Sequence, residues 1–179
     1  MFGRAFSTLA AALIAAPVAG QTVAEAAAAN VQLAITLCIQ NSHDGPQMLQ
    51  AFNAAGFAYT PEDFGGGHVL HWYGAPEGTA VTAIVIDPGR VTCRIDTPHF
   101  GVSQAIPFAR AVFQTLYNGP IWDGSPEGAR ILPGTPAGAQ DMCSGFHIIE
   151  PQFIWFQFGT GGQDPVCVDN GTSQISSGM

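Results

Sequence analysis

The chain contains no lysine, and its positive charge comes from five arginines alone. Thirteen acidic residues oppose them, so the formal net charge is −8 at pH 7. Nucleic acids and anionic membranes attract proteins that carry clustered positive charge. An acidic chain without lysine offers no such cluster, so we expect neither as a partner.

Motifs for catalysis and redox chemistry are also missing. The sequence has no G-x-S-x-G turn, which exposes the serine of many hydrolases, and no C-x-x-C pair of the thioredoxin type. Nothing in it indicates a cofactor, and we predict none. Whether the protein is an enzyme is left open by the sequence.

The first twenty residues have the three parts of a secretory signal peptide. Arg4 gives a positive start, Phe6–Ala16 forms a short apolar stretch, and small residues lead up to Gly20. That stretch is too short for a membrane span. We expect cleavage after Gly20, with Ala24–Ala26 as a second possible site, and a mature protein without a membrane span in the periplasm or outside the cell.

Four cysteines in an exported chain predict two disulfides. They are Cys38, Cys93, Cys143 and Cys167. We favour the pairs Cys38–Cys93 and Cys143–Cys167 among the three connectivities, because each pair then joins residues within one half of the chain. Zinc bound by Cys93, His99, Cys143 and His147 is the alternative, but the spacing lacks a close cysteine pair, so we predict no metal site.

Periodicity predicts an α+β fold in which an antiparallel sheet of five or six strands is packed by helices and stapled by disulfides. Apolar residues at helical spacing, with capping signals, predict helices over 24–41, 44–55 and 103–117. Alternating or aromatic-rich stretches predict strands at 68–73, 79–87, 90–96, 143–150 and 153–159. We expect a signal peptide at 1–20, a single domain over 21–170, and a polar, frayed tail at 171–179.

A similarity between two segments raises the question of an internal repeat. "GFAYTP" precedes "HVLHWYG" in the first half, and "GFHIIEP" precedes "FIWFQFG" in the second. Both join a Gly-Phe pair to a proline and then to an aromatic strand. The sequence alone is compatible with duplication and with chance.

Two histidines three residues apart, His68 and His71, are the first candidates for chemistry. On a helix this spacing would bring both imidazoles to one face, as a metal site needs. The segment has the composition of a strand, in which residues three apart point to opposite faces. We therefore expect two unrelated strand histidines.

The remaining acid–base candidates are scattered along the chain. Asp96, His99 and Ser103 supply the residue types of a hydrolytic triad, although a triad is recognised by its geometry. Glu127, His147 and Glu150 could act as acids and bases if they were buried together. A small exported hydrolase using His68, His71, Asp96, His99, His147 and Glu150 is the alternative function.

Arg90 and Arg94 are predicted to lie on one face of a strand, with Thr92 between them. Together they could bind a carboxylate or phosphate group, but pairing with nearby acids such as Asp87 or Asp96 is the more ordinary use. The strand around Trp155 carries bulky side chains on both faces. We expect an exported, non-catalytic protein that binds a partner or small ligand through such a sheet face.

Overall fold

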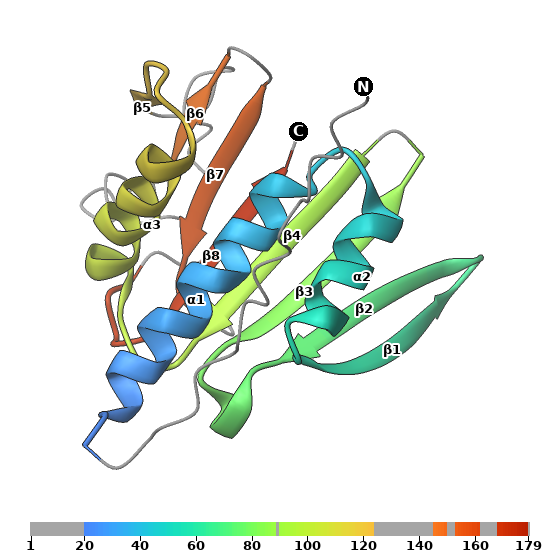
Figure 1. Ribbon diagram of the computed structural model, residues 1–179, viewed down its shortest axis with the longest axis horizontal. Helices are drawn as coiled ribbons and strands as arrows, with labels where there is room; N and C mark the ends of the chain where they lie inside the picture. The colour runs from blue at the N-terminus through green and yellow to red at the C-terminus, as the bar shows by residue number, and fades with distance from the viewer. Residues whose placement is uncertain (1–19, 89, 124–144, 150–152, 162–167, 179) are drawn as a thin grey trace, which may run out of the picture.

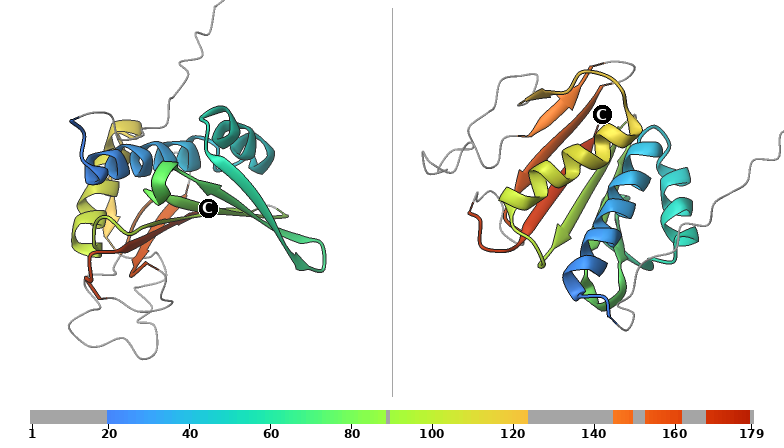
Figure 2. Two further views of the ribbon diagram at one scale, coloured as in Figure 1. Left: turned by 90° about the horizontal axis from the view of Figure 1, so that it is seen from below. Right: turned by 60° about the vertical axis from the view of Figure 1, so that its left-hand side comes forward.

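The described residues form an eight-stranded antiparallel sheet with three helices on one face (Figure 1, Figure 2). The computed structural model describes residues 20–88, 90–123, 145–149, 153–161 and 168–178. The helices are α1 (Val23–Gln40), α2 (Gly45–Ala54) and α3 (Val102–Leu116), with a short 3₁₀ turn at Pro76–Gly78. The strands are β1 (Ala58–Gly65), β2 (His68–Gly74), β3 (Val81–Asp87), β4 (Arg90–Thr97), β5 (Trp122–Asp123), β6 (Phe146–Ile148), β7 (Ile154–Gly159) and β8 (Ser173–Gly178).

Local signals explain where the first two helices begin. Thr22 and Glu25 form a reciprocal capping box at the start of α1. The Asp44 carboxylate accepts a hydrogen bond from the Gln47 N–H at 2.9 Å, which caps α2. α1 therefore begins two to three residues beyond the expected cleavage after Gly20, whereas cleavage at the second site would fall inside the helix.

The start of α3 depends on a contact from a distant part of the chain. Its N-cap residue, Gly101, has no side chain, and the Asp169 carboxylate lies against it. Asp169 also accepts a hydrogen bond from the Ser103 hydroxyl. A carboxylate at this position interacts favourably with the positive end of the helix dipole.

The sheet has an internal two-fold order. Its strands run β1-β2-β3-β4-β8-β7-β6-β5, so each half is a four-stranded meander, preceded in the chain by helix. β4 and β8 meet antiparallel at the centre, where Ile95 lies opposite Ile175. This order relates β2 to β6 and β3 to β7. The similar sequence segments instead match β2 with β7, so they do not follow this symmetry.

Two of our expectations about the sheet are wrong. In the described part of the chain it has eight strands instead of five or six, partly because β1 gives no clear alternation in the sequence. The predicted frayed tail, 171–179, contains β8, which is a central strand between β4 and β7. β8 has small polar residues, Ser173 and Ser177, on its buried face, and its stability comes from pairing on both sides.

The core lies between the helices and the sheet. Phe113 of α3 packs on Phe146 and Phe156, with ring centroids 5.8 and 5.4 Å away. α1 is long and apolar enough to cross a membrane by length and composition alone. Its buried residues, among them Val31 and Ile35, are fully enclosed in this core, so we interpret α1 as a core helix.

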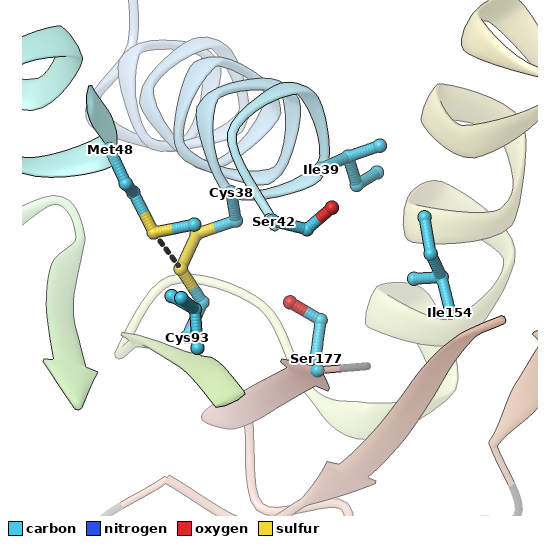
Figure 3. A pocket seen from close by; sticks show the side chains of 9 residues that line it. Cys38, Ile39, Ser42, Met48, Cys93, Ile154 and Ser177 are labelled. Carbon is cyan, nitrogen blue, oxygen red and sulfur yellow. Dashed lines mark hydrogen bonds between the residues drawn. A yellow bond between two sulfur atoms is a disulfide. The ribbon is translucent and has the colours of Figure 1, made fainter. Parts of the chain in front are cut away.

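The predicted Cys38–Cys93 disulfide is present and joins α1 to β4, with 6.1 Å between the Cα atoms. Both residues are 2% exposed. The Met48 sulfur lies 3.2 Å from the Cys93 sulfur (Figure 3). Because this disulfide is buried, we interpret it as structural. Cys143 and Cys167 lie outside the described residues.

Candidate binding face of the sheet

Every strand has one set of side chains that points away from the helices. We call the surface formed by these side chains the open face. Among the described residues, no helix lies on this side of the sheet (Figure 2). Residues directly opposite each other in an antiparallel pair share a face, so the pairing register shows which side chains are neighbours there.

One row of neighbours crosses the open face from β1 to β5. It passes through Glu62, Leu70, Val85, Thr92, Gly178, Trp155, His147 and Trp122. A second row, one pleat away, contains Thr60, Trp72, Ala83, Arg94, Ser176 and Gln157. Small or polar side chains thus occupy the centre of the sheet, with tryptophans towards both sides.

All three tryptophans of the chain lie on the open face. The Trp72 indole N–H donates a hydrogen bond to the Glu62 carboxylate at 2.7 Å. Trp155 covers Gly178, where an added Cβ would lie 2.8 Å from the indole carbon Cζ2. Trp72 and Trp155 are half-buried, and Trp122 is 53% exposed. The aromatic side chains of the core are instead those of phenylalanines and of Tyr73, packed with aliphatic residues.

The charged groups of the open face largely neutralise one another. Arg94 donates to both carboxylate oxygens of Asp96, from Nε at 3.0 Å and from an Nη at 3.4 Å. Arg90 lies opposite Asp87 in the register, and His68 Nδ1 is 3.7 Å from an Asp87 oxygen. The structure therefore places Arg90 and Arg94 on one face, as predicted, and gives Arg94 an acidic partner on its own strand.

The two histidines of β2 point to opposite faces. His68 lies beside Asp87 on the open face. His71 lies on the helix face, where its Nδ1 is 2.9 Å from the Tyr59 hydroxyl and its ring stacks on Tyr59 at 5.9 Å. Desolvation lowers the pKa of His71. These histidines therefore do not form a chelating pair.

The hydrolase candidates do not assemble into a triad. The Ser103 hydroxyl donates to Asp169, and Asp96 pairs with Arg94. The His99 Nε2 atom is buried without a hydrogen-bond partner in the described part of the chain. The strand pairing puts His147 on the same side of the sheet as Trp155, but its side chain is only 6% exposed and its ring lies 6.2 Å from that of Phe153. Glu127 and Glu150 are outside the described residues. The described residues also contain no group of three or more His, Cys, Asp or Glu placed to hold a metal ion.

A small cavity beside the disulfide has no room for a ligand. Its volume is about 10 Å³, and it lies between the end of α1 and the strands β4, β7 and β8. Ser42 and Ser177 both point into it (Figure 3). A space of this size holds a single water molecule at most. We therefore assign no binding role to it.

Sequence reasoning identified Arg94 and the aromatic strand, but it missed the way in which the open face is assembled. The alternation around Trp155 already separated this residue from Ile154 and Phe156, which are buried under the helices. Gln157 and Ser176 were not singled out, because their places beside Arg94 depend on the pairing of β4, β8 and β7.

Comparisons with protein-family models, with curated proteins and with solved structures found no match.

Proposed function

From this arrangement we propose that the protein is an exported, non-catalytic binding protein whose ligand occupies the open face of the sheet. The observation that carries the proposal is the location of all three tryptophans, Trp72, Trp122 and Trp155, on the face away from the core. Large aromatic side chains contribute strongly to folding when they are buried, and at the surface they are typical of binding sites.

Two further features support export and binding over catalysis. The chain begins with the pattern of a signal peptide, and the domain contains a buried disulfide, as is common outside the cytoplasm. Three of the described candidates are engaged with different partners: His71 with Tyr59, Asp96 with Arg94, and Ser103 with Asp169. A hydrolase would need such groups to converge on one reacting atom.

The test is a binding screen on the mature protein that uses its own tryptophan fluorescence. All three fluorophores lie on the open face, so a ligand bound there should change their emission. The panel holds oligosaccharides, free amino acids, nucleosides and short peptides of defined sequence, and each binder is recovered and checked for chemical change.

Matched variants decide whether the binding occurs on the open face. Trp72→Ala and Trp155→Ala remove aromatic surface from it, whereas Tyr59→Ala removes an exposed aromatic from the helix face. The proposal predicts a ligand that is recovered intact and that binds Tyr59→Ala normally but the tryptophan variants poorly. Turnover of the ligand, equal binding by all variants, or no binder in the panel would contradict it.

A further inference from the structure

Resting on the proposed function, we propose that the ligand is a neutral oligosaccharide lying across the strands from Trp72 to Trp155. Sugar rings have one or two faces of C–H groups and a rim of hydroxyls. The C–H faces pack on the electron-rich faces of aromatic rings, and the hydroxyls donate and accept hydrogen bonds. A suitable surface therefore needs fixed aromatic rings with uncharged or charge-balanced polar groups between them.

The two half-buried indoles meet the first requirement. Trp72 is held by its hydrogen bond to Glu62, and Trp155 is held over Gly178 of the neighbouring strand. Both side chains are thus positioned before a ligand arrives. Preorganised side chains bind more tightly because less conformational freedom is lost on binding.

The residues between the indoles meet the second requirement. Thr92, Arg94, Ser176 and Gln157 occupy neighbouring positions on the strands between and beside the two tryptophans. They offer hydroxyl, guanidinium and amide groups, which suit sugar hydroxyls. Arg94 is already balanced by Asp96, so a ligand that carries its own negative charge would have to compete with this carboxylate. The overall charge of −8 also disfavours an anion.

The separation of the indoles sets the size of the ligand. Trp72 is on β2 and Trp155 on β7, and β3, β4 and β8 lie between them. Four inter-strand spacings amount to about 19 Å along the sheet. A single sugar ring cannot reach across that distance. The ligand is therefore an oligosaccharide that spans several strands.

The same arrangement argues against a protein partner on this surface. Protein interfaces place their aromatic hot spots near the centre and surround them with a polar rim. Here Arg94, Asp96 and Ser176 are central, and the tryptophans flank them. An extended chain with repeated stacking units fits this order better than a globular partner does.

Isothermal titration of the mature protein with sugars of increasing length tests the proposal. The probes are cellohexaose, chitohexaose and maltohexaose, each compared with the disaccharide of the same linkage. We expect at least one hexasaccharide to bind about tenfold more tightly than its disaccharide, and Trp72→Ala or Trp155→Ala to weaken binding about tenfold, which is about 1.4 kcal/mol. Tyr59→Ala should leave the affinity unchanged.

A second variant guards against misfolding. Trp155→Ala uncovers Gly178 and could lower stability, so Gln157→Ala, which removes an exposed amide beside Ser176, is measured in parallel and should weaken binding several-fold. No hexasaccharide binding, or equal affinity for disaccharide and hexasaccharide, overturns the inference. If a peptide or nucleoside instead binds and is sensitive to the tryptophan variants, the inference fails and the proposed function survives. If a sugar binds equally to every variant, both fail.

Discussion

The Cys38–Cys93 disulfide should supply a large part of the stability of the domain. It joins residues 55 positions apart in the sequence, and closing a loop of that length removes about 14 cal/mol/K of entropy from the unfolded chain, or about 4 kcal/mol at 25 °C. Both half-cystines are 2% exposed and in contact with the core, so truncating them adds a small packing loss. The Cys38→Ala/Cys93→Ala double variant should therefore lose about 4 kcal/mol.

Urea unfolding followed by far-ultraviolet circular dichroism measures this loss. Cys143 and Cys167 are kept, and both cysteines of the disulfide are replaced together so that no unpaired thiol is left at this site. The m-value should rise, because the unfolded chain without this cross-link exposes more surface. Ser42→Ala is the matched control, since it changes a residue beside the disulfide but leaves the cross-link intact. A loss below about 1 kcal/mol in the double variant would refute the reasoning.

Four further predictions concern capping, titration and export. Asp169→Ala should cost about 1 kcal/mol in urea unfolding, because it removes the Ser103 contact and the negative charge at the start of α3. Burial raises the pKa of Tyr73 to about 12, so the unfolded chain loses this proton before the folded protein does. The free energy of unfolding should therefore fall by up to about 3 kcal/mol as the pH rises from 10 towards 12. In Tyr73→Phe this fall should be absent. Desolvation lowers the pKa of His71, so the unfolded chain binds this proton before the folded protein does. The free energy of unfolding should therefore fall as the pH drops below about 6.5, and His71→Gln should reduce this dependence on pH. The intact mass of the exported protein, measured without reductant, should match cleavage after Gly20 and the loss of the four hydrogens that two disulfides remove. A full-length mass would contradict export with cleavage, and a mass with four free thiols would contradict the disulfides.

Much of the fold follows from local patterns. The alternation of β4 separates Cys93 and Ile95 from Arg94, and in the structure Cys93 and Ile95 face the core while Arg94 faces away. The caps at Thr22 and Asp44 mark where α1 and α2 begin, because a side-chain oxygen next to the first helical turn acts within a few residues. Such signals lie in the sequence next to the helix or strand that they specify, so they can be recognised without the structure.

The central strand β8 could not be found in this way. Its residues Ser173 and Ser177 are buried although they are polar. The strand is held by its pairing with β4, which is distant in the sequence, and with β7, which precedes it. The candidate binding face could not be predicted for the same reason, because it depends on pairing between strands. The alternation in β2 and β7 shows which way Trp72 and Trp155 point relative to their own neighbours, but their places on either side of Arg94 depend on pairings across five strands.

Chemical-shift mapping of the mature protein tests the open face most directly. Three indole N–H signals, from Trp72, Trp122 and Trp155, report on that face, and the protein is titrated with the tightest binder from the panel. Our account predicts the largest shifts at the Trp72 and Trp155 indoles and at the Arg94 and Gln157 amides. Largest shifts in α1, α2 or α3, with all three indole signals unmoved, would contradict it.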